Sequence, residues 1–421
     1  MQDHPILAHV VLGYSPMIDR HRTVFATRLT LFPERPDMHV DAVALLAALT
    51  EVWPDEAVKL TLSLRALNPA SGTSESTAAT GPRASLNLAG EALLQGVMAA
   101  APGAQLMIEV PAFMAADPVH ASALRELHAA GRTLLIKGRP LAELPRELLP
   151  CFSHSIIDLS EERRGTTPPA AVVRNITTVQ SGVRTQADIE AAFQRGAVAV
   201  IGWPLDDVVA AAKGRGGVPP DLHVIMELID GVDRELPVDR LEAVLRRDPT
   251  LAFRLMRYLN SPAFGMSVEI NSFRHALMLL GYSRLKRWLA LLLVSASKDV
   301  NMKPVMFAAL RRGLLMEELV RHNGDAELRG EMFICGVFSL LDHMLKLPFE
   351  ELLKALPVPD RVRDALISRQ GPLAPYLELV CAIENEALFD IRECADRVFM
   401  GLLEINGAVL RALRSARQLD A

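Results

Sequence analysis

Four basic residues in the first half of the chain stand in or beside strand-like segments, where they could hold a phosphate. They are Arg28 in VFATRLTLF, Lys137 and Arg139 in LLIKGRP, and Arg184 in GVRT. Arginine and lysine donate charge-assisted hydrogen bonds to phosphate oxygens. One interpretation is therefore a site that accepts an anionic nucleotide.

The sequence lacks the short motifs of the best-known catalytic sites. It contains no G-x-S-x-G elbow, no Walker loop, no H-E-x-x-H pair and no G-x-G-x-x-G in a supporting context. Its cysteines are far apart and form no C-x-x-C pair, which predicts ordinary buried thiols in a reducing cytoplasm. These cysteines are Cys151, Cys335, Cys381 and Cys394.

The elements that would position the basic residues alternate between strands and helices up to about residue 205. Strands are predicted near 6–13, 23–32, 58–64, 84–88, 104–110, 132–137, 153–159, 172–177 and 197–202, with helices near 39–52, 89–101, 117–130, 141–149 and 185–195. Strands separated by helices pair in parallel through right-handed crossovers, and this repetition favours a (β/α)8 barrel. The first two strands are close in sequence, so the barrel is expected to open with an antiparallel hairpin.

Three residues in this order resemble positions of the EAL domain, a barrel that hydrolyses cyclic di-GMP. They are Asn87 in ASLNL, Glu109 in LMIEVP and Asp158 in SIIDLS, and VRT, a helix and GAVAVIGWPL follow them. The resemblance implies an active site in which carboxylates at strand ends hold two divalent cations and activate a water.

Other positions depart from the EAL pattern. Arg28 stands where the family has its namesake glutamate, and Lys137-Gly138 replace an Asp-Asp pair. The full set of replaced positions is Arg28, Lys137, Gly138, Ile156, Ser181, Arg184 and Ile201. Basic side chains repel cations, so the sequence predicts a degenerate barrel with no catalytic residue, no metal and no cofactor.

Asn87, Glu109 and Asp158 then have two interpretations. As remnants of a lost site, they would hydrogen-bond the backbone or pair with Arg28 and Lys137. Alternatively, the basic mouth still binds an anionic nucleotide without cleaving it. Because most of the family's binding contacts are replaced as well, the sequence predicts against nucleotide binding.

Residues 213–221, KGRGGVPPD, predict a linker between a barrel domain over 1–212 and a helical domain over 222–421. Helices are predicted near 222–233, 237–247, 249–260, 272–280, 283–297, 304–322, 327–346, 348–355, 359–369, 372–387 and 391–417. The last is long and amphipathic. Packing in the core is one interpretation of its apolar face, and a partner or dimer interface is the other.

Residues 248–298 carry the most distinctive helical pattern. Asp248-Pro249 would begin a helix, Asn260-Ser261-Pro262 would end it, and Gly281 would separate the next two helices. This arrangement resembles the HDOD domain, an all-helical signalling domain related to the HD metal-dependent phosphohydrolases.

A second segment, GVFSLLD at 336–342, resembles the place where HD enzymes carry an adjacent His-Asp pair of metal ligands. Ser339 and Leu340 stand there instead, and Asp342-His343 is reversed in order and one turn late. An imidazole shifted along a helix points in another direction. The sequence therefore predicts no metal site in the helical domain.

Conserving a fold without its chemistry suggests recognition through a surface. The predicted interaction face comprises Asn260, Ser261, Pro262, Phe264, Tyr282, Arg284, Lys286, Arg287 and Trp288. Packing within the domain is the alternative for Phe264 and Trp288.

The composition limits which partners and which location the sequence supports. The chain has 421 residues, 50% of them hydrophobic, and a formal net charge of −5. This balance gives no electrostatic case for nucleic acid or an anionic membrane. No apolar run approaches the roughly 20 residues that span a bilayer, and we expect a cytoplasmic protein.

The predicted fold class is α/β plus all-α: a (β/α)8 TIM-like EAL barrel followed by an all-helical HDOD domain. The predicted function is a non-enzymatic signalling adaptor in a bacterial cyclic di-GMP context, with signalling proteins or a second copy as partners. The alternatives are a receptor for cyclic di-GMP or another anionic nucleotide, and a residual metal-dependent phosphodiesterase.

Overall fold

The computed structural model divides into two compact units, and their boundaries differ from the expected domains. It describes residues 4–35, 37–54, 83–139, 144–163, 176–207, 220–245, 247, 273–295, 299–323, 325–356 and 358–420. Residues 1–207 and 381–414 form one unit, here called the barrel unit. Residues 208–380 and 415–421 form the other, here called the helical unit.

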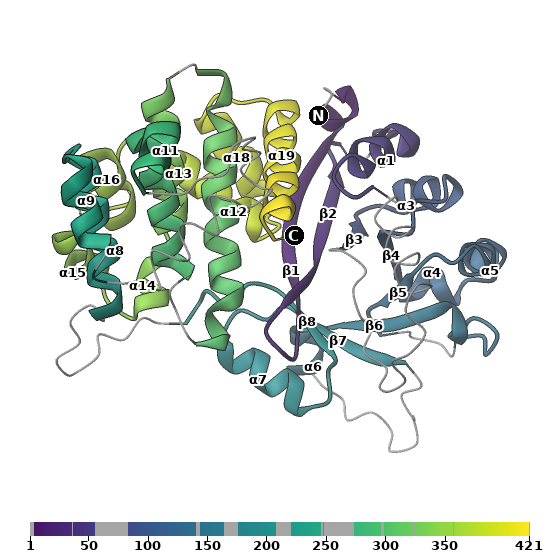
Figure 1. Cartoon of the computed structure of the whole chain (residues 1–421). Coiled ribbons are helices and arrows are strands. Elements are labelled where there is room, and N and C mark those ends of the chain that lie inside the picture. Colours follow the sequence, from purple (N-terminus) through teal and green to yellow (C-terminus); the bar gives the residue numbers. More distant parts are fainter. Residues whose placement is uncertain are drawn as a thin grey trace, which may run out of the picture. The chain divides into compact units, whose positions relative to one another are not determined.

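The barrel unit is a closed sheet whose strands are neighbours in chain order (Figure 1). The strands are β1 (Val10–Asp19), β2 (Val24–Pro33), β3 (Arg83–Leu88), β4 (Leu106–Pro111), β5 (Leu134–Lys137), β6 (Phe152–Asp158), β7 (Thr177–Ser181) and β8 (Ala199–Ile201). β1 is antiparallel to both β2 and β8, and the other neighbours are parallel. The predicted barrel with an opening hairpin is confirmed. The expected strand at 58–64 lies outside the described residues.

The opening hairpin is closed by a short turn between β1 and β2. Asp19 Oδ1 accepts hydrogen bonds from the backbone N–H groups of His21 and Thr23, both at 2.8 Å. Arg22 in this turn has a φ of 60°. β1 itself begins later than the predicted 6–13, because Pro5 starts the 3-10 helix η1 (Pro5–His9).

Helices connect the parallel strands. They are α1 (Ala42–Thr50), α3 (Glu91–Ala99), α4 (Ala112–Ala116), α5 (Ala121–Ala129), α6 (Leu159–Arg163) and α7 (Gln186–Gln194), with short 3-10 turns η2 (Pro118–His120) and η3 (Leu149–Cys151). Asp41 caps α1 by accepting from two backbone N–H groups. Thr185 and Asp188 form a capping box at the start of α7.

The inside of the barrel has an apolar floor and a polar layer next to it. The floor cluster comprises Met17, Ala26, Met107, Leu135, Ile156, Val179, Ala199 and Ile201. Side chains two residues apart on a strand share a face. Arg28, Glu109 and Lys137 therefore point into the barrel beside the floor, toward the carboxyl ends of the parallel strands.

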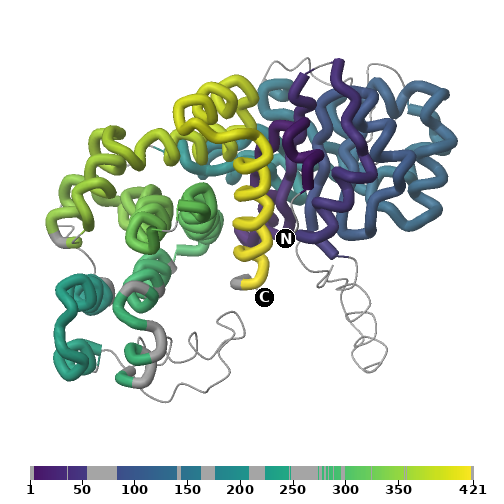
Figure 2. The backbone as a smooth tube through the Cα atoms, turned by 90° about the horizontal axis from the view of Figure 1, so that it is seen from above, coloured from purple at the N-terminus to yellow at the C-terminus, as the bar shows by residue number. Residues whose placement is uncertain are grey.

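Two helices from the end of the sequence pack on the barrel. α18 (Leu388–Arg397) and α19 (Leu402–Asp420) follow one another, and α19 lies beside β1 in two views at right angles (Figures 1 and 2). The buried Asn406 amide donates to the carbonyl oxygens of Leu7 and Val10, at 2.8 and 2.7 Å. The C-terminal segment is therefore part of the barrel unit.

The single long helix predicted over 391–417 is wrong, because the chain breaks between α18 and α19. Phe399 has a left-handed φ of 55°. The Phe399 N–H donates a hydrogen bond to Asp396 O, and the Met400 N–H donates one to Ala395 O. This pair of bonds is a Schellman ending, a position that glycine usually marks in a sequence.

The helical unit contains helices that largely follow the predicted order. They are α8 (Pro220–Asp233), α9 (Val238–Leu245), α11 (Phe273–Ser295), α12 (Lys303–Leu319), α13 (Ala326–Phe338), α14 (Leu341–Leu345), α15 (Phe349–Ala355), α16 (Asp360–Ile367) and α17 (Ala374–Glu384), which ends in the barrel unit. Gly281, with φ 70° and ψ 170°, bends α11 where the sequence predicted a break. No helix in the described part of the chain is both long and apolar enough to span a bilayer.

The two central helices of the helical unit cross closely at a pair of glycines. A Cβ added to Gly336 of α13 would lie 2.6 Å from the backbone C and O of Arg312 in α12. A Cβ at Gly313 would lie 2.4 Å from a methyl group of Val337. Both positions therefore need glycine for the helix backbones to approach.

Candidate functional site

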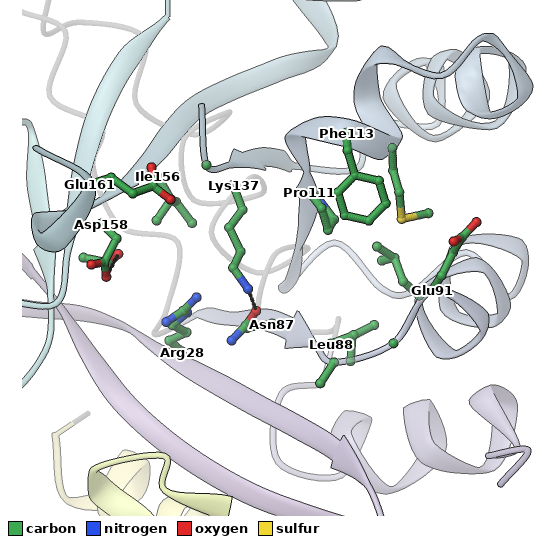
Figure 3. A pocket seen from close by; sticks show the side chains of 16 residues that line it. Arg28, Asn87, Leu88, Glu91, Pro111, Phe113, Lys137, Ile156, Asp158 and Glu161 are labelled. Carbon is green, nitrogen blue, oxygen red and sulfur yellow. Dashed lines mark hydrogen bonds between the residues drawn. The ribbon is translucent and has the colours of Figure 1, made fainter. Parts of the chain in front are cut away.

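A cavity of about 550 Å³ opens at the mouth of the barrel (Figure 3). This volume falls within the range of small-molecule sites, roughly 300–1,000 Å³. Its polar lining comes from several strand ends and the segments that follow them: Arg28, Asn87, Glu91, Lys137, Asp158, Glu161 and Ser181. Gly138 and Ile156 line it too. The structure therefore brings together most of the sequence-predicted barrel positions.

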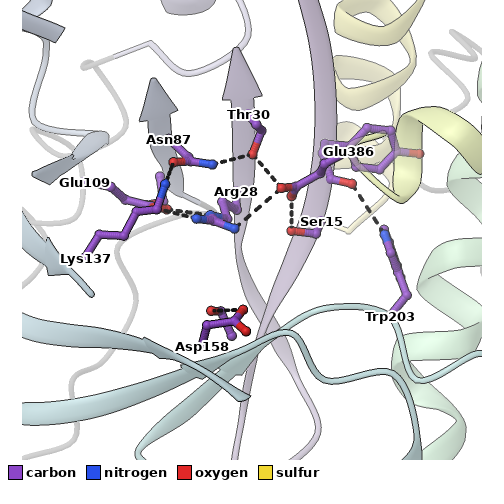
Figure 4. A network of polar contacts seen from close by, with 12 residues as sticks. Ser15, Arg28, Thr30, Asn87, Glu109, Lys137, Asp158, Trp203 and Glu386 are labelled. Atoms are coloured by element: carbon purple, nitrogen blue, oxygen red, sulfur yellow. Dashed lines mark hydrogen bonds and ion pairs between the residues drawn. The ribbon is translucent and has the colours of Figure 1, made fainter. Parts of the chain in front are cut away.

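Arg28, which lines the cavity, forms a buried ion pair with Glu109 (Figure 4). Arg28 Nε donates to Glu109 Oε1 at 2.8 Å and Arg28 Nη2 donates to Oε2 at 2.7 Å. Ser85 Oγ also donates to Glu109 Oε1. Burial alone lowers the pKa of Arg28, but Glu109 and Glu386 together raise it above its ordinary value. The guanidinium is held as a cation in a fixed orientation.

Lys137 and Asn87 form the second pair of the site (Figure 4). Lys137 Nζ donates to Asn87 Oδ1 at 2.6 Å, and Asn87 Nδ2 donates to Thr30 Oγ1 at 2.9 Å. Burial, and then the charge of Arg28, lower the pKa of Lys137. Among the described residues, no carboxylate is within hydrogen-bond distance of this ammonium. Its donors are available to an anion in the cavity.

Asp158 lies on the side of the cavity away from Phe113 (Figure 3). Its Oδ1 accepts from Ser160 Oγ at 2.6 Å and from Ser160 N at 2.9 Å, and its Oδ2 accepts from Ser181 Oγ at 3.1 Å. The carboxylate is thus bonded by neighbouring hydroxyl and backbone groups. Glu109 and Asn87 make the predicted pairings with Arg28 and Lys137, and Asp158 accepts a backbone hydrogen bond, which was the other predicted arrangement.

Four predicted barrel positions do not line the cavity: Glu109, Arg139, Arg184 and Ile201. Ile201 is part of the apolar floor. Arg184 is exposed, 3.4 Å from Asp206 and 3.1 Å from Asn385 Oδ1.

Sequence reasoning missed a carboxylate that enters the barrel from the C-terminal segment. Glu386 accepts from Ser15 Oγ at 2.5 Å and from Thr30 Oγ1 at 2.6 Å, and lies 3.5 Å from Arg28 Nη1. Gly13, in the interior of β1, was the available signal, because a glycine inside a strand often marks a close backbone approach.

The described residues do not fit a site for two divalent cations. Nowhere in the described ranges do three or more His, Cys, Asp or Glu side chains gather so that they could hold a metal ion. At the barrel mouth, the Arg28 guanidinium occupies both oxygens of Glu109. Cations prefer sites rich in carboxylate oxygens.

In the helical unit, the positions that resemble HD metal ligands are buried and packed. Ser339 Oγ donates to Gly336 O at 2.7 Å and accepts from Arg312 Nη1 at 3.1 Å. Leu340 is buried. Burial raises the pKa of Asp342, although the adjacent His343 opposes this shift.

The predicted interaction face is described only in part. Asn260, Ser261, Pro262 and Phe264 lie outside the described residues, as does the side chain of Trp288. Tyr282 Oη donates to Leu236 O, Lys286 pairs with Asp233, and Arg287 pairs with Glu317 and lies over the ring of Phe333. Arg284 is exposed. The role of this face stays a prediction.

Comparison with protein families identifies the region that contains these helices. The family model described as the HDOD domain matches residues 218–352. These residues are an HDOD domain. The resemblance seen at 248–298 and 336–342 is thereby confirmed.

Two curated proteins share substantial sequence identity with the chain. The cyclic di-GMP phosphodiesterase CdgJ of Vibrio cholerae is 32% identical over 204 residues, which are 48% of this chain and 47% of CdgJ. The protein YuxH of Bacillus subtilis is 33% identical over 166 residues, which are 38% of this chain and 40% of YuxH. The matched part is thus less than half the length of either relative.

Structures of EAL domains are similar to about half of the chain. The PaMucR phosphodiesterase in complex with c-di-GMP covers 47% of this chain and 91% of its own, with 20% identity and a TM-score of 0.30. The barrel itself is established by its strand pairing.

The prediction that the chain is not an enzyme is wrong, because CdgJ is named a cyclic di-GMP phosphodiesterase. That prediction inferred the absence of catalysis from the loss of acidic residues on the barrel strands alone. Glu386 shows that a carboxylate can enter the mouth from a distant segment. Replacement of strand residues therefore does not decide which chemistry the mouth supports.

Proposed function

We propose that this chain acts in cyclic di-GMP signalling and that the barrel mouth binds the cyclic dinucleotide. The observation that carries the proposal is the cavity of about 550 Å³ with Lys137 at its base. The Lys137 ammonium is held by a neutral amide oxygen and faces the cavity. Such an ammonium offers charge-assisted hydrogen bonds to a phosphodiester. This proposal replaces the prediction against nucleotide binding.

The remaining lining suits a ligand with flat bases and a charged backbone. Phe113 is exposed and lies on the wall of the cavity with Leu88 and Pro111 (Figure 3). An exposed aromatic ring is a surface on which a base stacks. Asn87 and Ser181 add polar groups that could orient the ligand.

Calorimetric titration with cyclic di-GMP tests the proposal. The chain is expected to bind, and Lys137→Met is expected to weaken binding by about 10-fold or more, as for loss of one hydrogen bond to a charged group. Arg125→Met, which removes an exposed cation of the same unit, serves as the control and is expected to leave affinity unchanged. Absence of binding by the unaltered chain would refute the proposal.

Hydrolysis is assayed in the same samples with Mg²⁺ or Mn²⁺. The name of CdgJ suggests this activity, and turnover lost together with binding in Lys137→Met would place it at the barrel mouth. A protein partner for the HDOD domain and a cytoplasmic location stay predictions. Affinity capture from the native cell with the full chain and with Arg284→Glu tests the first of these.

A further inference from the structure

Two adjacent side chains in the turn between α17 and α18 bind polar groups at the barrel mouth. Asn385 Oδ1 accepts from Arg184 Nη2 at 3.1 Å. Glu386 accepts from the hydroxyl groups of Ser15 and Thr30 and lies 3.5 Å from Arg28 Nη1 (Figure 4). We call residues 385–386 the clasp. It engages two of the four basic residues that the sequence assigned to anion binding.

The backbone of the clasp is held in a conformation that an L-residue rarely adopts. Glu386 has a φ of 55°. The N–H of Glu386 reaches Ile383 O and the N–H of Ala387 reaches Ala382 O, which is a Schellman ending of α17. Glycine is the usual residue at this position, because a Cβ atom disfavours the left-handed backbone conformation. The glutamate side chain must therefore gain enough from its contacts to offset the strained backbone.

β1 is shaped to receive this turn. A Cβ added to Gly13 would lie 2.8 Å from Glu386 Cα and 3.0 Å from Ile383 O. Gly13 and Ser15 are two residues apart on β1 and so share a face. Their direct partners on β2 are Thr30 and Arg28, which point to the same side of the sheet. The close approach of the clasp to the inner face of the barrel thus depends on a missing side chain.

The clasp changes the charge that a ligand meets. Glu109 takes the Nε and Nη2 groups of Arg28, and Glu386 approaches Nη1. One guanidinium therefore faces two carboxylates, and this group of three carries a net charge of −1. Like charges repel, so the group opposes the entry of a dianionic dinucleotide.

We propose that Glu386 competes with a ligand phosphate for Arg28 and thereby sets the affinity of the barrel mouth for its ligand. Its carboxylate holds the part of Arg28 that a ligand phosphate would otherwise contact. Release of the clasp then opens a second cationic contact beside Lys137. The inference rests on the proposed binding of a cyclic dinucleotide and adds the residue that regulates it.

The test compares calorimetric affinities for cyclic di-GMP in the full chain. Glu386→Gln removes the charge and can still hydrogen-bond the hydroxyl groups, so it is expected to tighten binding by about 10-fold, the effect of one nearby unit charge. Glu386→Gly suits the left-handed backbone and is expected to fold and to tighten binding as well. Gly13→Ala, which pushes the turn away, is expected to act in the same direction.

Glu393→Gln is the matched control, because Glu393 is an exposed acid on α18 and its loss changes the net charge equally. Its affinity is expected to equal that of the unaltered chain. If the chain binds and Glu386→Gln binds equally or more weakly, the inference is overturned while the proposed function stands. If neither the chain nor any variant binds, the proposed function fails and the inference fails with it.

Discussion

At the scale of single residues, the Arg28–Glu109 pair has the largest expected effect on stability. Glu109 is 1% exposed and Arg28 9% exposed. Arg28→Met leaves a buried carboxylate without its cation, which costs about 3–5 kcal/mol. Urea denaturation should show this loss of unfolding free energy. Replacing Glu109 with Leu in the same chain should restore much of it, because both charges are then gone.

The matched control for this prediction is an exposed ion pair of the same unit. Arg125 and Glu147 are 53% and 71% exposed and 3.5 Å apart. Arg125→Met is expected to change stability by no more than about 1 kcal/mol. Equal losses for Arg28→Met and Arg125→Met would contradict the importance given to burial.

Lys137 makes ligand binding depend on pH. Its pKa is lowered by burial and by Arg28, so the ammonium loses its proton below the ordinary lysine value of about 10.4. An anionic ligand favours the charged form. Affinity is therefore expected to be full below the lowered pKa and to fall as the pH rises through it.

Titrations across alkaline pH check this direction. Lys137→Arg keeps its charge throughout this range and is expected to hold its affinity at pH values where the unaltered chain has lost it. The same alkaline decline in both proteins would assign the effect to another group.

The sequence predicted the residues of the cavity better than it predicted their partners. Arg28, Lys137 and Asp158 were found because the order of the motifs around them resembles that of the EAL domain. Glu386 could not be found, because its approach depends on tertiary packing between segments far apart in the chain. Local periodicity carries no information about such a contact. Gly13 was the one local sign of it.

At the scale of elements, the crossing of α12 and α13 depends on glycine at one position and tolerates alanine at another. A Cβ at Gly336 would lie 2.6 Å from the backbone of α12, whereas a Cβ at Gly330 meets nothing within 4 Å. Gly336→Ala is expected to destabilise the protein by about 1–3 kcal/mol through overpacking. Gly330→Ala is expected to stabilise it by about 0.5–1 kcal/mol, because alanine favours a helix.

Thermal unfolding of both glycine variants tests the crossing. They lie in the same helix and differ in what their new methyl group meets. A similar change in midpoint for both would mean that helix propensity alone, rather than the close approach of α12, determines the outcome.

The break between α18 and α19 shows where element prediction failed. The sequence carries apolar residues at helical spacing through this region, so one helix was predicted. The left-handed residue is Phe399 rather than Gly401. A helix ending of this kind is set by the packing of both helices, which periodicity cannot reveal. Gly281, by contrast, was a correct local signal.

At the scale of the whole molecule, the barrel unit depends on residues near the end of the sequence. Asn406 holds α19 to the backbone of η1 and β1 with two hydrogen bonds. Asn406→Leu is expected to lower the unfolding free energy by about 1–3 kcal/mol, because buried carbonyl oxygens lose their donor. Urea denaturation monitored by far-ultraviolet circular dichroism measures this loss.

Truncation tests the division into units directly. A chain ending at Val380 lacks residues 381–414 and is expected to unfold at lower temperature than the full chain. A chain ending at Arg414 keeps the barrel unit whole and serves as its control. If both shortened chains melt alike, the C-terminal helices contribute nothing particular to the barrel.

The barrel unit is built from two segments that lie far apart in the chain, and this affects how it folds during synthesis on the ribosome. β1 is the first strand to be translated, but Glu386 and Asn406 emerge only after residues 208–380 of the helical unit. Contacts between such distant segments form slowly because a long loop must close first. For most of its synthesis the nascent chain therefore holds β1 without the contacts that α18 and α19 supply, and the barrel unit is complete only when these last helices have been translated.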